Sequence, residues 1–146
     1  EISLLENYLH LQQFRYRNKF DYSVMIDEEA KKCCSLKLIL QPIAENCILH
    51  GMGKNFMRIR VTAEKRNSEI WISIQDDGEG MEKERLLQIQ KELEAGFENT
   101  EKHIGLGNVN KRIRLYFGEA YGVIVTSGNH FTKVDVHFPA VLEDRK

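Results

Sequence analysis

Four runs of alternating apolar and polar residues most constrain what this chain can fold into. They form two neighbouring pairs, 56–67 with 69–76 and 122–129 with 131–139. Alternation with a period of two is typical of strands with one buried face, and a short connection such as Asn67-Ser68 favours a hairpin. The sequence therefore predicts two antiparallel hairpins, and the same alternation in 20–27 predicts a further strand.

The intervening segments favour helices. We expect helices at 3–19, 36–51, 82–95 and 108–118, and a turn at 28–34. Ser35 is a candidate N-cap, Gly51 a helix stop, and Pro42 is compatible only with a helix that begins or kinks there. The order helix, strand, helix, hairpin, helix, helix, hairpin predicts an α+β fold. We expect a two-layer α/β sandwich, with helices on one face of a mostly antiparallel, mixed sheet.

Bulk properties narrow the class of protein. At 146 residues with 42% hydrophobic residues, the chain is long enough for one domain with a core. A net charge of −1 offers no basic field for nucleic acid or an anionic membrane. Cys33, Cys34 and Cys47 show no metal-ligand spacing, so we interpret them as buried thiols in a reducing compartment. No apolar run approaches the roughly 20 residues of a membrane span.

The first polar signal is the pair Asn46 and His50. Residues four apart lie on the same side of a helix. An Asn oxygen can ligate Mg²⁺, and a nearby His can donate a hydrogen bond to a phosphate oxygen. The alternative is a solvated helix face with a His near the Gly51 stop.

The second signal is Asp76-x-Gly78-x-Gly80, directly after a predicted strand. A carboxylate at a strand end can accept a hydrogen bond from the exocyclic amine of adenine, and glycines let the backbone approach the ring. Asp77 is the weaker candidate because Asp76 begins the motif. The alternative is an ordinary turn, in which Asp and Gly are the usual residues.

The third signal is HIGLGNVNKRI, with Gly105 and Gly107 just before a predicted helix start. Backbone N–H groups at a helix N-terminus form an anion site. Arg112 lies four residues after Asn108 and could face the same way. The long connection 95–107 is of a kind that is usually mobile or functional. A glycine-containing loop without a ligand is the alternative.

In this order, the motifs Glu-Asn-x-x-x-His-Gly, Asp-x-Gly-x-Gly and Gly-x-Gly-Asn resemble the ATP-binding domain of sensor histidine kinases. That domain belongs to the Bergerat-fold ATPase superfamily, and the resemblance covers about residues 36–139. The Gln-Pro-x-x-Glu-Asn and Gly-Leu-Gly-Asn-x-x-x-Arg segments are similar to those of the autolysis and carbon-source sensors of bacteria. The resemblance implies ATP and Mg²⁺ as cofactors.

The resemblance also implies residue roles. Asn46 would hold Mg²⁺, with Glu45 and His50 beside it as catalytic residues, and 95–104 would form a lid. The residues implied to contact the nucleotide are Asn46, His50, Gly51, Asp76, Gly78, Gly80, Met81, Ile104, Gly105, Leu106, Gly107, Asn108, Arg112 and Thr132. Two positions depart from the family pattern, since Leu49 stands where Lys is frequent and Phe131 stands where Gly usually precedes the Thr.

The resemblance favours a kinase over an ATPase. Relatives that hydrolyse ATP carry a general-base Glu one helical turn before the Mg²⁺ Asn, and Pro42 occupies that position here. Glu45 is about 100° around the helix from Asn46 and points elsewhere. We therefore expect phosphoryl transfer to a protein histidine. The alternatives are a serine kinase of the anti-sigma-factor type and a nucleotide-gated interaction module without transferase activity.

The acceptor histidine is expected upstream of this chain, because the Pro-His-Phe segment of the subfamily does not occur in it. His10 is the candidate nearest the start, but it lies on a helix leading into the domain. We expect residues 1–20 to be the end of a linker or dimerisation helix and 21–146 to be the catalytic domain. The expected partners are the upstream dimerisation and phosphoacceptor region, a response regulator and a second copy of the full-length parent, and not nucleic acid. The domain would be cytoplasmic and its parent a bacterial membrane protein.

Overall fold

The computed structural model describes residues 2–16, 19–33, 39–51, 56–95 and 104–141. In chain order the elements are α1 (Ile2–Arg15), β1 (Phe20–Ile26), α2 (Glu28–Lys31), α3 (Leu40–Gly51), β2 (Met57–Arg66), β3 (Glu69–Asp76), α4 (Lys83–Ala95), α5 (Ile104–Phe117), β4 (Gly122–Gly128) and β5 (Phe131–Pro139). No helix in the described ranges is both long enough and apolar enough to span a bilayer.

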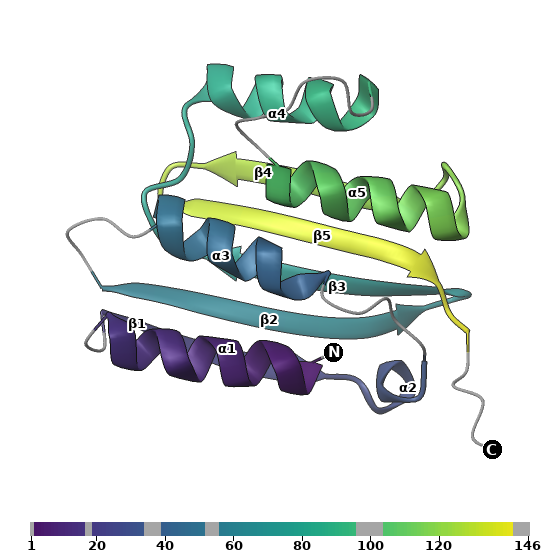
Figure 1. The fold of residues 1–146 in the computed structure, drawn as a ribbon, viewed down its shortest axis with the longest axis horizontal. Coiled ribbons are helices and arrows are strands. Elements are labelled where there is room, and N and C mark those ends of the chain that lie inside the picture. The colour runs from purple at the N-terminus through teal and green to yellow at the C-terminus, as the bar shows by residue number, and fades with distance from the viewer. Residues whose placement is uncertain (1, 17–18, 34–38, 52–55, 96–103, 142–146) are drawn as a thin grey trace.

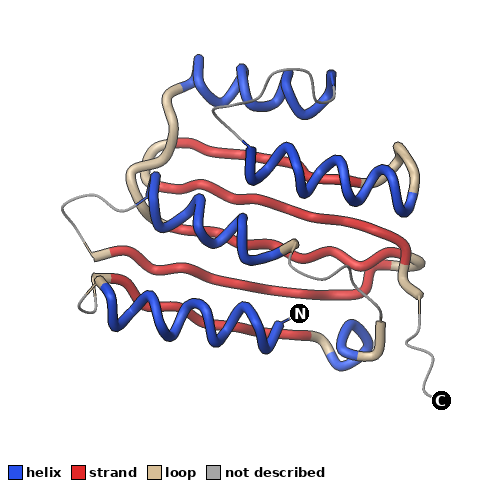
Figure 2. The backbone as a smooth tube through the Cα atoms, in the orientation of Figure 1, coloured by secondary structure: helices blue, strands red, loops and turns tan. Residues whose placement is uncertain are grey.

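The strands form one mixed sheet in the order β1-β2-β3-β5-β4. β1 runs parallel to β2, and the other three pairings are antiparallel. Helices α1, α3, α4 and α5 lie over one face of this sheet (Figures 1 and 2). The predicted two-layer α+β fold and both predicted hairpins are therefore confirmed.

Strand alternation builds the core between the two layers. In β2 every second residue from Met57 to Ala63 is buried, and the same alternation holds along the helix-facing side of β3 and β5. The helices complete this layer with Leu5 and Leu9 of α1 and Ile43 of α3, all fully buried. Burying one such side chain contributes about 1.5–3 kcal/mol, so the helix layer is held mainly by apolar contact.

Helices α2 and α1 differ from the prediction. Residues Glu28–Lys31 form the short helix α2 where a turn was expected. Its first turn carries Glu28 and Glu29, whose charges favour a helix N-terminus, and Glu28 pairs with Lys31 at 3.1 Å. Helix α1 ends at Arg15, four residues before the predicted end.

Helix α5 begins at Ile104, four residues before its predicted start. Gly107 therefore lies within the first turn of the helix and not in a loop. The physical reason is burial, because Leu106, Val109 and Ile113 are spaced as one helical face and are at most 2% exposed. Helix α3 begins at Leu40, and Pro42 lies in its first turn, where a missing N–H breaks no helical hydrogen bond. The predicted N-cap Ser35 lies outside the described residues.

Side chains of the helices form hydrogen bonds with outward-facing backbone groups of both edge strands. On β1, Gln13 Nε2 donates to the carbonyl of Phe20 at 3.4 Å. On β4, Gln90 Nε2 donates to the carbonyl of Val125 at 2.8 Å, and Asn110 Oδ1 accepts the N–H of Val123 at 2.9 Å. The edge strands are thus tied to the helices that flank them.

Candidate functional site

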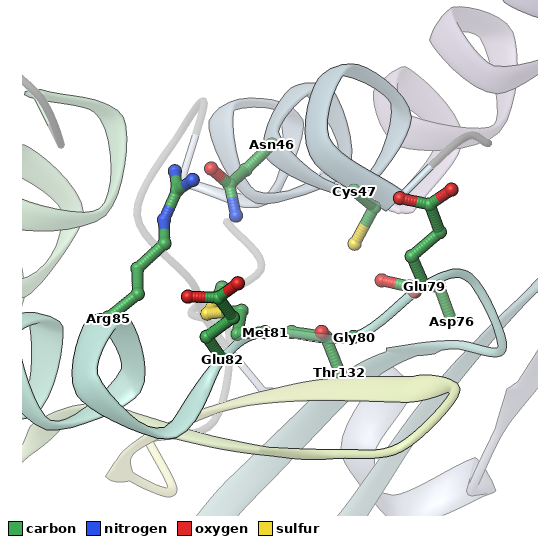
Figure 3. A pocket seen from close by; sticks show the side chains of 9 residues that line it. All are labelled: Asn46, Cys47, Asp76, Glu79, Gly80, Met81, Glu82, Arg85 and Thr132. Carbon is green, nitrogen blue, oxygen red and sulfur yellow. The ribbon is translucent and has the colours of Figure 1, made fainter.

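A cavity of about 370 Å³ lies where the end of β3 meets α3 and the start of α4 (Figure 3). It is lined by Asn46, Cys47, Asp76, Glu79, Gly80, Met81, Glu82, Arg85 and Thr132. Five of these residues were predicted to be in the site, namely Asn46, Asp76, Gly80, Met81 and Thr132. The fold thus brings residues far apart in the sequence to one cavity.

Asp76 is the buried acid of the cavity. It is the last residue of β3 and is 2% exposed. Its Oδ1 accepts the N–H of Gly78 at 3.0 Å, which closes the turn after the strand. Burial raises the pKa of Asp76, and hydrogen bonds from Gly78 and from the Cys47 thiol partly oppose that rise. The result is a fixed carboxyl group whose oxygen can accept a hydrogen bond from a ligand.

The neighbouring Asp77 has a different environment. Its N–H donates to the carbonyl of Arg58 at 3.1 Å, and its Oδ1 accepts the N–H of Arg58 at 2.5 Å. These bonds extend the pairing of β2 with β3 by one residue. Asp77 is exposed and does not line the cavity, whereas Asp76 does.

Cys47 comes from α3 and places its thiol beside Asp76. Burial raises the pKa of this thiol well above its usual value, and the carboxylate of Asp76 and their hydrogen bond raise it further. A thiol of this kind stays protonated and serves as a donor and not as a nucleophile. The prediction of a buried thiol is confirmed for Cys47 but wrong for Cys33, which is only half-buried, while Cys34 lies outside the described residues.

Gly80 is required by the protein's own backbone. Its φ is +78°, and a Cβ at this position would lie 2.0 Å from the carbonyl oxygen of Gly128. Gly80 also bridges to Asn129, and the N–H of Met81 donates to Ser127 Oγ at 2.9 Å. The sequence prediction assigned this glycine to close approach by a ligand. The structure shows that the glycine lets the turn lie against the β4–β5 hairpin.

Ser127 of β4 fixes the floor of the cavity and was missed by the sequence analysis. Its hydroxyl donates to the carbonyl of Phe131 at 2.7 Å and lies 3.0 Å from Thr132 Oγ1. Thr132 stands opposite Asp76 in the β3–β5 register and is buried. Phe131 is not among the lining residues, and its ring lies beside Gly128. The departure at Phe131 therefore leaves Thr132 in the cavity wall.

On α3, Asn46 lines the cavity and Glu45 does not. Glu45 Oε1 accepts a hydrogen bond from Gln41 Nε2 at 3.4 Å. Glu45 also lies near Tyr8 of α1, whose pKa is raised to about 12 by burial and then by the Glu45 charge. The carboxylate is thus directed toward α1, and this placement does not support the predicted catalytic role of Glu45.

The predicted phosphate-binding residues are only partly described. Gly78, Leu106, Gly107, Asn108 and Arg112 do not line the cavity. The Leu106 side chain belongs to the core at 2% exposed, so only its backbone could meet a ligand. The side chains of Leu49, His50, Gly51, Ile104 and Gly105 and the central part of the predicted lid, 96–103, lie outside the described residues. The roles of these residues stay predictions.

Four lining residues were absent from the sequence prediction: Cys47, Glu79, Glu82 and Arg85. The last two stand at the start of α4, where charged residues are common on any solvated helix. Their only sequence signal is a position directly after Asp-x-Gly-x-Gly. Charged side chains at the start of α4 thus form part of the cavity wall.

The chain matches the family model described as "Histidine kinase-, DNA gyrase B-, and HSP90-like ATPase" over residues 35–141. Sensor histidine kinase YesM of Bacillus subtilis (strain 168) is 36% identical over 130 residues, which cover 87% of this chain and 21% of that protein. The chain therefore spans about a fifth of the length of this curated relative.

Solved structures show the same fold. The catalytic domain of histidine kinase ThkA superposes with a TM-score of 0.70 at 17% identity, covering 93% of this chain and 90% of that one. ThkA in complex with response regulator protein TrrA gives a TM-score of 0.62 at 17% identity, covering 98% of this chain and 41% of that one. At these identities the likeness concerns the fold alone.

Proposed function

The chain belongs to the family of histidine kinase-, DNA gyrase B- and HSP90-like ATPases, as an ATP-binding catalytic domain of the histidine-kinase type, and we propose that it donates the γ-phosphate of ATP to a histidine elsewhere in its parent protein. The observation that carries the proposal is Asp76, a buried carboxyl group at a strand end, facing a cavity with Asn46 on the opposite wall.

In this proposal Asp76 recognises the adenine base. Its carboxyl oxygen accepts a hydrogen bond from the exocyclic amine of adenine, which guanine cannot offer in the same position. The neighbouring wall is formed by Gly80, Met81 and Thr132. The Cys47 thiol forms a hydrogen bond with the Asp76 carboxyl group. The pocket should therefore prefer ATP over GTP.

Asn46 fits a magnesium site. Its amide is in the cavity wall, and the described residues contain no group of three or more His, Cys, Asp or Glu side chains that could hold a metal ion. Mg²⁺ at nucleotide sites is commonly bound through one or two protein oxygens together with phosphates and waters, which agrees with this arrangement. When bound, the ion neutralises phosphate charge. We propose Asn46 as its protein ligand.

The acceptor histidine is proposed to lie outside this chain. His10 is exposed on α1, its ring stands edge-on to Phe14 with centroids 6.3 Å apart, and no described residue of α1 lines the cavity. We propose that 1–20 belongs to a linker or dimerisation helix that precedes the catalytic domain, 21–146. The acceptor would come from an upstream dimerisation region in a homodimeric parent.

The wider context is also proposed. Histidine kinase ThkA forms a complex with response regulator protein TrrA, which supports a response regulator as the downstream partner here. By analogy with membrane sensors, the domain would be cytoplasmic and the parent would lie in the bacterial cell membrane. Nucleic acid is not an expected partner, because the net charge is −1.

The test uses γ-labelled ATP with this chain alone and with the upstream helical segment of its parent added. We expect acid-labile label only on the added segment, because phosphoryl transfer needs a positioned attacking nitrogen. Label on the chain alone that disappears in His10→Gln would make His10 the acceptor. Acid-stable label on an added protein would indicate a serine kinase, and tight ATP binding without any transfer would indicate a nucleotide-gated interaction module.

A further inference from the structure

Arg85 is the one cation among the lining residues that the structure describes. The other charged residues of the cavity wall are Asp76, Glu79 and Glu82. Arg85 projects from the first turn of α4, and within the described residues it makes no hydrogen bond or ion pair. A guanidinium group in a cavity wall without a protein partner has its donors available for a ligand.

The cavity has two distinct ends. Figure 3 shows Arg85 on one side and Asp76 on the other, with Asn46 of α3 on the Arg85 side. A ligand whose base lies against Asp76 would therefore extend its other end toward Asn46 and Arg85. For a nucleotide, that other end is the phosphate tail.

The acids of the cavity wall make a protein cation favourable on the Arg85 side. The acids in the wall repel a polyphosphate, and Coulomb repulsion between groups about 4 Å apart is of the order of kcal/mol near a protein surface. The planar guanidinium group donates two parallel hydrogen bonds to phosphate oxygens, a geometry that Lys cannot reproduce. None of the five residues predicted from sequence to be in the cavity, Asn46, Asp76, Gly80, Met81 and Thr132, carries a positive charge.

We propose that Arg85 is a phosphate-binding residue of this pocket, and that it selects nucleotides with a phosphate tail over the bare nucleoside. The inference rests on the proposed binding of an adenine nucleotide and deepens it by assigning the cation that receives the phosphates. The predicted anion site at residues 104–108 is a separate element, so the two sites can be tested independently.

The experiment titrates adenosine, AMP, ADP and ATP, with Mg²⁺, into the wild-type chain and three variants by calorimetry. The variants are Arg85→Gln, Arg85→Lys and the control Lys83→Gln, which changes an exposed cation of the same helix turn outside the cavity. Loss of a charge-assisted hydrogen bond predicts that Arg85→Gln weakens ATP about tenfold to a hundredfold. Adenosine affinity should be unchanged, Arg85→Lys should be intermediate, and Lys83→Gln should match wild type.

The position in the series at which Arg85→Gln first departs from wild type identifies the phosphate that Arg85 contacts. Equal weakening of adenosine and ATP would assign Arg85 to the shape of the pocket and overturn the proposal. If Arg85→Gln leaves the affinities for both adenosine and ATP unchanged, the proposal is overturned as well. If wild type binds none of the four ligands, the proposed function fails together with this inference, whereas wild-type binding of ATP separates the two.

Discussion

The two sides of the cavity are built in different ways. The base side consists of the turn after β3 and the β4–β5 hairpin, which are joined through the backbone of Gly80 and Met81 and the half-buried hydroxyl of Ser127. The phosphate side carries Glu82 and Arg85, exposed side chains of a helix start. One side is thus shaped by backbone geometry and burial, and the other by exposed charge.

This difference predicts how each side responds to substitution. A change to the residues that join the turn to the hairpin on the base side alters folding and binding together, because the contacts of Gly80 and Met81 with the hairpin also shape the cavity. A change on the phosphate side alters the preference between ligands and leaves folding intact, because exposed charged pairs contribute only about 0–1 kcal/mol to stability. Variants of both sides test the comparison.

The largest effect is expected from Gly80→Ala. The new Cβ would lie 2.0 Å from the Gly128 carbonyl at φ +78°, so the turn must leave the hairpin. Strain and overpacking predict a loss of at least about 2 kcal/mol in the free energy of unfolding, with loss of ATP binding. The matched control is Gly118→Ala, at φ +119° with nothing within 4 Å of the Cβ. Urea unfolding and calorimetry measure both, and equal effects of the two changes would contradict the assigned clash.

The next effect is expected from Asp76→Asn. An amide donor facing the adenine amine leaves both groups unpaired, which costs about 1–3 kcal/mol and weakens ATP roughly tenfold or more. The amide oxygen can still accept the Gly78 N–H, so unfolding at pH 7 should change little. Calorimetric titration with ATP and GTP measures the binding, and unchanged ATP affinity would mean that the base is read elsewhere.

A smaller effect concerns pH. Burial raises the pKa of Asp76 above its ordinary 3.8, so the folded chain holds this proton more tightly than the unfolded chain. Relative to Asp76→Asn, wild type should therefore gain stability as the pH falls from 7 through the raised pKa, and lose that gain as the pH rises again. The slope is at most about 1.4 kcal/mol per pH unit. Urea unfolding of both proteins across this range measures the difference, and the opposite slope would rule out a raised pKa.

The smallest effect is expected from Glu82→Gln on the phosphate side. Removing an exposed acid from the wall should tighten ATP by about 0.5 kcal/mol and leave the free energy of unfolding unchanged. Glu84→Gln, an exposed neighbour outside the cavity, is the control. Affinity at low and high salt measures the effect, which should shrink as salt screens the repulsion. Weaker ATP binding in Glu82→Gln would show that this acid assists the ligand.

The sequence predicted which helices and strands form better than it predicted the residues at which they begin and end. Alternation located the hairpin strands, because a strand with one buried face shows its pattern locally. The start of α5 was placed too late, since Gly105 and Gly107 resemble a loop and only the buried neighbours Leu106 and Val109 extend the helix to Ile104. The parallel pairing of β1 with β2 could not be predicted, because no local pattern specifies a partner strand.

In the cavity, the sequence located residues with a chemical motif and missed those placed by folding. Asp76 and Asn46 stand in recognisable patterns, and both line the cavity. Ser127 and Arg85 carry no pattern, since a strand serine and a helix arginine are common on any surface. Gly80 also lines the cavity, but the sequence does not show its close neighbour, the Gly128 carbonyl of a hairpin about 50 residues away in sequence.

The glutamines on the edge strands have a consequence for self-association. An edge strand with open carbonyl and N–H groups can pair with the edge of another molecule, which is a common start of aggregation. Here the side chain of Gln13 donates a hydrogen bond to the outward carbonyl of Phe20, and that of Gln90 donates one to the carbonyl of Val125. An incoming strand would have to displace a helix side chain to form a hydrogen bond with either of these carbonyls. The sheet can therefore stop at five strands without a charged residue at each blocked position.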